Sequence, residues 1–310
     1  MKLDIIFSTY NGSARLGPML QAFRGLEIPT SLQVSIIVID NASTDNTAAL
    51  LRQFQSDLPI TVLEQKEPGK NKSLNFGLQF STADLVVLTD DDILPNADWL
   101  VQLADACRTQ PDFDLFGGVI APHWPKAPPR RLLKSIPLGP AYAITPADIT
   151  TGPCDTSRIW GPNMAVRRRV FSAGYHFDER FGPKGQDYVM GGESEFLQRC
   201  QEGGYRGYFV EGARVRHIIR KEQLTPKWLF SRAHRFGRRL FYEDVSKHEG
   251  LPQSAELMGA PRWAVRQSIQ WQLAAKIALN MSYNATWKAG LHKGYIHEYQ
   301  IWNCRLKNGP

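Results

Sequence analysis

The segment LVVLTDDD, residues 85–92, consists of four apolar residues, one threonine and three aspartates. A short apolar run of this kind predicts a strand buried on both faces, as in a parallel sheet flanked by helices. Ligands of such sheets bind just beyond the carboxyl ends of the strands. Three neighbouring carboxylates repel one another, so a bound divalent cation is an economical explanation for Asp90, Asp91 and Asp92. A solvated acidic turn before a helix from Asn96 explains the triplet alone equally well.

The residues before this segment alternate between strand and helix patterns. Apolar, β-branched runs predict strands, and apolar residues at helical spacing predict helices between them. The expected strands are residues 3–7, 34–39, 60–63 and 85–88, and the expected helices pass through 19–23, end at 54 and span 73–80. Asp40 directly follows the second strand, and Ser43 or Thr44 is a candidate helix cap. This alternation predicts an α/β fold with a mostly parallel central sheet flanked by helices.

The rest of the chain is first irregular and then helical. Residues 121–153 are rich in proline and are expected to form a long excursion near the site. Helices are expected beside 167–171 and over 193–200, and short strands over 208–210 and 215–219. From Pro226 onward the pattern is helical, basic and aromatic. We therefore expect one domain over residues 1–220 and a helical C-terminal region over 221–310.

The composition is that of a globular protein with an uneven charge. A chain of 310 residues with 43% hydrophobic and 22% charged residues excludes wholesale disorder. Residues 205–310 carry 18 Lys and Arg against 7 Asp and Glu, a net +11, whereas the remainder of the chain is net −4. A basic region of this kind suits an anionic substrate, an anionic membrane surface or nucleic acid.

Neither a signal peptide nor a bilayer-spanning segment is expected, because no window approaches the ~18–20 apolar residues that a span requires. The cysteines lie too far apart for a metal-binding pair and are interpreted as reduced thiols; they are Cys107, Cys154, Cys200 and Cys304. These features predict a cytoplasmic protein. Peripheral attachment to the inner face of the membrane stays open.

Four segments in order resemble the inverting family 2 glycosyltransferases of the GT-A fold, and the resemblance covers about residues 3–240. They are Ile6-Phe7-Ser8-Thr9-Tyr10-Asn11, Val38-Ile39-Asp40-Asn41-Ala42-Ser43-Thr44-Asp45, Gly69-Lys70-Asn71-Lys72-Ser73-Leu74-Asn75-Phe76-Gly77-Leu78 and Asp90-Asp91-Asp92-Ile93-Leu94-Pro95. The resemblance implies a Rossmann-like catalytic domain over 1–220 that binds a nucleotide sugar and an acceptor. Four ordered matches are far more specific than any one of them.

The resemblance also implies roles for individual residues toward the donor. Thr9, Asn11 and Asp40 would contact the nucleoside, Lys70 the diphosphate, and Asp90 and Asp92 the ribose and a Mn²⁺ or Mg²⁺ ion. Asp91 is chemically an equally good ligand. His217 would reach the metal or the diphosphate, although an ordinary buried or surface histidine explains it as well. A basic cluster could clamp the diphosphate or simply form a solvated helix face; it consists of Arg232, His234, Arg235, Arg238 and Arg239.

Two further segments resemble the acceptor half of the family. Trp160-Gly161-Pro162-Asn163-Met164-Ala165 is similar to its G-x-N segment beneath the acceptor site, and the resemblance makes Asn163 a candidate contact of the donor. Gly191 to Arg199 resembles the segment that carries the catalytic base, with Gly192 where a glutamate is frequent. Alignment on Arg199 favours Glu193 as the base, leaves Glu195 as the alternative, and admits a simple pair of helix N-terminal charges.

The resulting expectation is an inverting, metal-dependent glycosyltransferase that transfers a single sugar, because the QxxRW motif of processive synthases is absent. A UDP-hexose is the favoured donor, and a glycan or lipid-linked saccharide of the cell envelope the expected acceptor. Two rivals stay open. The first is a sugar-phosphate nucleotidyltransferase, which would normally show a glycine-rich loop after the first strand, whereas this sequence has Ser8-Thr9-Tyr10-Asn11-Gly12 there. A non-catalytic basic protein binding membrane or nucleic acid leaves the aspartates and Glu193 unexplained.

Overall fold

The computed structural model describes residues 1–185, 188–251, 254–277 and 282–308. The chain forms two compact units. The first unit consists of Met1–His123, Tyr142–Gln186 and Gly192–Ile218, and the second of Trp124–Ala141, Asp187–Gly191 and Ile219–Pro310. The second unit therefore includes two segments that precede residue 220, and the division of the chain at that residue stays a prediction.

A mixed sheet forms the centre of the first unit, with the strand order β3-β2-β1-β4-β8-β6-β9-β5 and with β7 beside β9. The strands are β1 (Lys2–Thr9), β2 (Gln33–Asp40), β3 (Ile60–Glu64), β4 (Leu85–Leu88), β5 (Ile93–Pro95), β6 (Leu115–His123), β7 (Gly152–Cys154), β8 (Met164–Arg167) and β9 (Gly207–Ile218). The first four strands pair in parallel. This confirms the predicted α/β fold and its four N-terminal strands, to which β8, β5 and β7 add antiparallel pairs.

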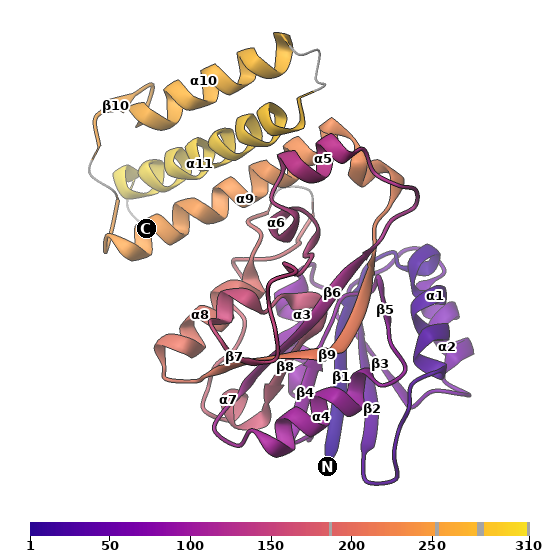
Figure 1. Cartoon of the computed structure of the whole chain (residues 1–310). Helices are drawn as coiled ribbons and strands as arrows, with labels where there is room; N and C mark the ends of the chain where they lie inside the picture. Colours follow the sequence, from indigo (N-terminus) through magenta and orange to yellow (C-terminus); the bar gives the residue numbers. More distant parts are fainter. Residues whose placement is uncertain (186–187, 252–253, 278–281, 309–310) are drawn as a thin grey trace. The chain divides into compact units, whose positions relative to one another are not determined.

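Helices cover both faces of this sheet, because alternate residues of a strand point to opposite sides. Leu3, Ile5 and Phe7 of β1 pack in one core with α1 (Ser13–Arg24), α2 (Thr47–Phe54) and α4 (Trp99–Thr109). Ile6 lies in the other core with α3 (Lys70–Leu78), α7 (Arg168–Ser172) and α8 (Gly192–Glu202). Figure 1 shows α1 and α2 side by side. Two 3₁₀ turns, Thr156–Arg158 and Gly161–Asn163, precede β8.

The structure corrects several sequence predictions. The expected strands 208–210 and 215–219 are one continuous strand, β9, whose pairing with β6 shifts between Gly118 and Val119. The residue that caps α2 is Asn46 rather than Ser43 or Thr44. A short strand, β5, follows the aspartates, so the next helix begins at Trp99 and not at Asn96. The excursion 121–153 contains α5 (Arg130–Ser135), α6 (Leu138–Tyr142) and most of β7.

The second unit is mainly helical, as expected from residue 226 onward. It contains the turn Lys221–Leu224, α9 (Pro226–Lys247), the hairpin β10 (Glu256–Leu257) and β11 (Ala260–Pro261), α10 (Arg262–Ile277) and α11 (Tyr283–Asn308). Figure 1 shows α11 between α9 and α10. Arg238 of α9 donates to the Glu298 carboxylate of α11 at 2.6 Å inside this packing. Among the helices of the described residues, none has the length and hydropathy needed to cross a bilayer.

Candidate active site

The aspartates after β4 do not form one cluster, and Asp91 turns toward β1. Its Oδ2 atom accepts a hydrogen bond from Thr9 Oγ1 at 2.7 Å and another from Arg15 Nη2 at 2.8 Å. Arg15 also donates to the backbone oxygen of Tyr10 at 3.0 Å. Burial and the neighbouring Asp92 carboxylate raise the pKa of Asp91, against the opposing effect of the guanidinium. The carboxylate of Asp91 is thus engaged by the protein itself.

Asp92 faces His217, which lies in β9 opposite Ile93 of β5. His217 Nε2 is 3.2 Å from Asp92 Oδ1, and His217 Nδ1 is 2.7 Å from the backbone oxygen of Tyr142. A carbonyl oxygen only accepts, so Nδ1 carries a hydrogen and Nε2 faces the carboxylate. Burial by itself lowers the pKa of His217, but the Asp92 carboxylate outweighs it and raises that pKa. A proton or a cation at Nε2 satisfies this arrangement.

The Asp92–His217 pair fits a hard divalent cation. An imidazole whose other nitrogen donates to a carbonyl is the usual arrangement of a metal-binding histidine. Within the described part of the chain, no group of three or more His, Cys, Asp and Glu side chains is arranged to hold a metal. Magnesium sites that act on phosphates commonly use one or two carboxylates and leave the remaining positions to phosphate oxygens and water. The pair matches that pattern.

Asp90 is joined to the start of α8 through Lys70, the first residue of α3. Lys70 Nζ donates to Asp90 Oδ1 and to Glu193 Oε1. Burial alone would lower the pKa of Lys70, but the two carboxylates raise it well above its usual value. A single ammonium group therefore links the end of β4 to the first turn of α8, across more than a hundred residues of sequence.

Glu193 and Glu195 differ in their partners. Arg199 donates from Nη2 to Glu195 Oε2 at 3.0 Å and from Nε to Glu195 Oε1, and it also donates to the His176 backbone oxygen at 2.7 Å. Glu195 is thereby held along its own helix. Glu193 instead lies toward Lys70 and Asp90. Of the two glutamates, Glu193 is the one that the structure brings to the aspartates.

Gly192 occupies the position where the resembled family often has a glutamate. A β-carbon there would lie 2.2 Å from Asn71 Nδ2. Asn71 is buried and donates to the Asp178 backbone oxygen at 2.8 Å, so it has little room to move. Asn71 therefore leaves no room for a side chain at position 192. The sequence alone did not reveal this contact, because Asn71 and Gly192 lie far apart in the chain.

Asp40 is the last residue of β2, paired with Thr9 at the end of β1, and Asn11 lies in the turn after β1. Asp40 Oδ1 accepts from the Ser43 backbone N–H at 3.1 Å. Asn11 donates its backbone N–H to Ser43 Oγ at 2.9 Å, and its Oδ1 accepts from the Thr44 N–H at 2.8 Å. These hydrogen bonds hold the two turns together beside the aspartates.

Asn163 is not brought into the open site. Its side chain is fully buried, accepts from Trp99 Nε1 at 2.9 Å, and donates to the backbone oxygens of Ala213 and Val119 at 2.8 and 3.1 Å. The amide is therefore committed to α4, β6 and β9. The expectation that Asn163 contacts the donor is corrected in favour of a role in holding these elements together.

The arginines of α9 belong to the second unit, and their partners do not favour a diphosphate clamp. Arg238 is buried with Glu298, and Arg239 pairs with Glu243. Arg232 Nε donates to the Pro140 backbone oxygen at 3.0 Å, and Arg235 lies over the Tyr188 ring at 4.8 Å. Arg238 in particular is corrected to an internal ion pair.

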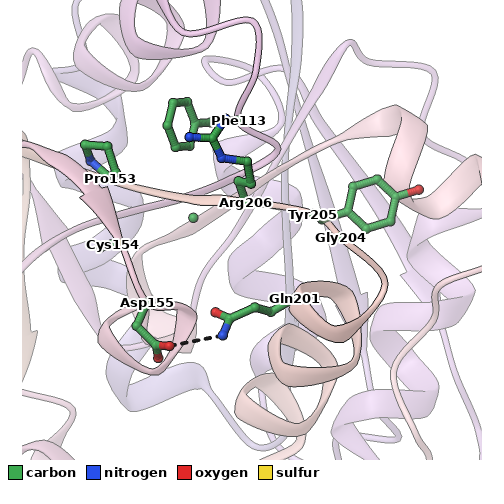
Figure 2. Close-up of a pocket in the computed structure, with 9 residues that line it drawn as sticks. Phe113, Pro153, Cys154, Asp155, Gln201, Gly204, Tyr205 and Arg206 are labelled. Carbon is green, nitrogen blue, oxygen red and sulfur yellow. Dashed lines mark hydrogen bonds between the residues drawn. The ribbon is translucent and has the colours of Figure 1, made fainter.

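Figure 2 shows a pocket elsewhere in the first unit, where Arg206 lies over the Phe113 ring and Gln201 donates to Asp155 at 3.0 Å. It lies at Gly207, where β9 begins beside Leu115 of β6. His217 pairs with Pro122, seven residues along β6 from Leu115, which is about 23 Å for an extended strand. This pocket is therefore separate from the aspartates.

The model of the family described as Glycosyl transferase family 2 matches residues 4–174. The chain is 23% identical over 239 residues to a glucosyl-dolichyl phosphate glucuronosyltransferase of Haloferax volcanii, covering 75% of this chain and 74% of the relative. It is 26% identical over 205 residues to the glycosyltransferase AglE of the same organism, covering 66% and 62%.

Solved structures share the fold. The mannosyltransferase PcManGT of Pyrobaculum calidifontis, solved with GDP-Man and Mn²⁺, superposes with a TM-score of 0.62 at 19% identity, covering 97% of this chain and 87% of that one. Residues 1–349 of S. aureus TarS, solved with UDP-GlcNAc, give a TM-score of 0.56 at 15% identity, covering 98% and 92%. The GT-A architecture expected from the sequence motifs is thereby confirmed.

Proposed function

The chain belongs to glycosyl transferase family 2 and is a glycosyltransferase, and we propose that it transfers a single sugar, with inversion, from a nucleotide sugar to an acceptor hydroxyl. The contact of Lys70 with both Asp90 and Glu193 carries this proposal. It joins Asp90, which we assign to the donor, to Glu193, which we assign to the acceptor.

The donor occupies the carboxyl edge of β1, β2 and β4. We assign Thr9, Asn11 and Asp40 to the nucleoside, Asp90 and Asp91 to the ribose side, and Lys70 to the diphosphate. Thr9 and Asp91 share a hydrogen bond, so the nucleoside end of the site is held by one connected set of side chains. A UDP-hexose is the favoured donor. GDP-sugars are the first alternative, because the structurally similar proteins were solved with UDP-GlcNAc and with GDP-Man.

Asp92 and His217 would hold a Mn²⁺ or Mg²⁺ ion. Asp90, which the resemblance also assigns to the metal, is paired with Lys70, so its contact with the ion is the weaker part of the proposal. When bound, the ion neutralises the negative charge that the diphosphate gains as it leaves. Tyr142 contributes through its backbone oxygen, which orients the His217 ring with Nε2 toward Asp92. Arg15 keeps Asp91 turned toward β1, so we assign Asp91 to the ribose side of the donor and not to the metal.

Glu193 acts as the general base. It accepts the proton of the acceptor hydroxyl while that oxygen forms a bond to the anomeric carbon. The bond from the anomeric carbon to the diphosphate oxygen breaks on the opposite face, and a single displacement of this kind inverts the configuration. The Lys70 ammonium favours the ionised form of Glu193, because an opposite charge stabilises a carboxylate, and only the ionised form accepts a proton.

A saccharide, in particular a lipid-linked one, is the proposed acceptor, since a relative over 75% of this chain is named a glucosyl-dolichyl phosphate glucuronosyltransferase. Peripheral membrane contact through the C-terminal region and a role in the cell envelope are part of the same proposal. Nucleic acid is not an expected partner.

A panel of nucleotide sugars tests the proposal by thermal shift, with and without Mn²⁺, because a ligand of the native state raises the melting temperature. We expect a metal-dependent shift with one nucleotide class. The anomeric configuration of the product, determined by NMR, then tests inversion. Absence of any shift across the panel would refute the donor assignment, and a retained configuration would refute the single displacement.

A further inference from the structure

Most of the large apolar side chains of α10 are exposed. The residues that α10 buries are small, namely Ala264, Val265, Ser268 and Ala275. Trp271 is half-buried, with the Lys288 ammonium over its ring. The other large apolar residues are exposed, with Trp263 at 45%, Ile269 at 50%, Leu273 at 54% and Ile277 at 84%. A surface helix that serves only the core of a protein has the opposite pattern. The outward face of α10 therefore carries apolar area that the described fold does not use.

Basic residues are interleaved with this apolar row. Arg262, Arg266 and Lys276 are exposed, and α10 contains no acidic residue. At 3.6 residues per turn, these three cations and Ile269, Leu273 and Ile277 fall within an arc of about 100°. We call these six residues the α10 face. It is a single stripe, apolar along its middle and positively charged at both ends.

The carboxylates near the α10 face are already engaged. Residues 262–310 contain one acidic residue, Glu298, which is buried and bound to Arg238 and Tyr242. In the hairpin before α10, Glu256 accepts a hydrogen bond from Tyr299 at 2.7 Å. The positive charge of the α10 face is therefore available to an anionic partner.

We propose that the α10 face docks on the surface of a lipid bilayer that contains anionic headgroups. Its isoleucine and leucine side chains enter the boundary between headgroups and acyl chains, and the arginine and lysine side chains contact lipid phosphates. A second copy of the chain is a poorer partner, because like charges would meet. Nucleic acid is also poorer, because its phosphates would leave the apolar row without a contact. This inference deepens the membrane contact proposed above for the C-terminal region, and it does not depend on the catalytic assignments.

Cosedimentation of the full chain with vesicles tests this proposal, comparing phosphatidylcholine alone with phosphatidylcholine plus phosphatidylglycerol. We expect binding to the anionic vesicles that weakens with added salt. The variant I269Q/L273Q/I277Q and the variant R262Q/R266Q/K276Q should each lower the partition coefficient at least about tenfold. The control I28Q/F80Q removes apolar residues that are similarly exposed in the first unit, at 46% and 52%, and should bind like the parent chain.

Quenching of tryptophan fluorescence by brominated lipid adds a readout of position. Trp263 begins the exposed row, so Trp263→Phe should remove part of the quenching on anionic vesicles. Circular dichroism confirms that each variant is folded. Failure of the parent chain to bind anionic vesicles would overturn the proposal, as would binding by both α10 variants equal to that of the parent chain. Binding to duplex DNA that requires the three cations but not the three apolar residues would also overturn it. So would a dimer of the parent chain that I269Q/L273Q/I277Q abolishes.

Discussion

A β-carbon on Gly161 would lie 2.9 Å from the carboxyl carbon of Glu193. The turn before β8 therefore lies against the glutamate that we assign as the base. Because Gly161 has no side chain, the Glu193 carboxyl group can occupy this position. Thr89 Oγ1 donates to the Pro162 backbone oxygen at 2.7 Å and fixes this turn to the end of β4. The turn thereby sets where Glu193 lies relative to the aspartates.

Gly161→Ala should displace the Glu193 side chain at little cost in stability, because a flexible side chain can move aside. We expect transfer to fall at least about tenfold, since misplacing a reacting group by roughly an ångström can cost about a hundredfold. Donor affinity should be unchanged. Gly17→Ala, in α1 with no atom within 4 Å of the new β-carbon, is the control and should keep full activity. Normal turnover by Gly161→Ala would show that Glu193 is not confined there.

The two glutamates of α8 can be separated by matched amide substitutions. Glu193→Gln should bind donor normally and lose transfer by a factor of about 10²–10⁴, the usual contribution of a general base. Glu195→Gln should keep its activity and lose only the ion pair with Arg199, worth up to about 1 kcal/mol at a partly exposed position. Initial rates and chemical denaturation measure both. The reverse result would move the base to Glu195.

His217→Gln should weaken the metal requirement for donor binding without unfolding the first unit. We expect the Mn²⁺ concentration for half-maximal donor binding to rise about 10–100-fold, a typical cost of losing a metal-orienting group. Chelation by EDTA should abolish transfer by the parent enzyme, and Mn²⁺ should restore it. His248→Gln changes an exposed histidine of the second unit and should leave the titration unaltered. Identical metal titrations for His217→Gln and the parent would remove His217 from the metal site.

Asn163→Ala should cost stability rather than donor affinity. The substitution removes three hydrogen bonds and leaves the Trp99 indole N–H and two backbone oxygens without their partner, at a cost of about 3 kcal/mol. Asn96→Ala, at an exposed position, should stay within about 0.5 kcal/mol. Urea unfolding and donor titration give the two quantities. A stable Asn163→Ala variant with weakened donor binding would contradict this prediction and support a direct contact between Asn163 and the donor.

Short-range patterns were sufficient for the framework of the fold. The run before Asp90 predicted β4 correctly because a buried parallel strand needs only four to six consecutive apolar residues. The order of strands and helices up to that point placed Thr9, Asp40 and the aspartates at one sheet edge. In the second half, prediction was weaker: β9 continues through Glu211 and Gly212, whose composition suggested a break.

The amino-acid sequence alone determined the α/β order, the strand-to-aspartate junction and the choice of two glutamates, because each depends on residues close together in the chain. Only the tertiary structure assigned Asp90 to Lys70, Asp91 to Arg15 and Asp92 to His217, buried Asn163, and left most of the large apolar side chains of α10 exposed. Those outcomes join residues that are distant in sequence. They depend on packing and on competition among charges, which no local pattern encodes.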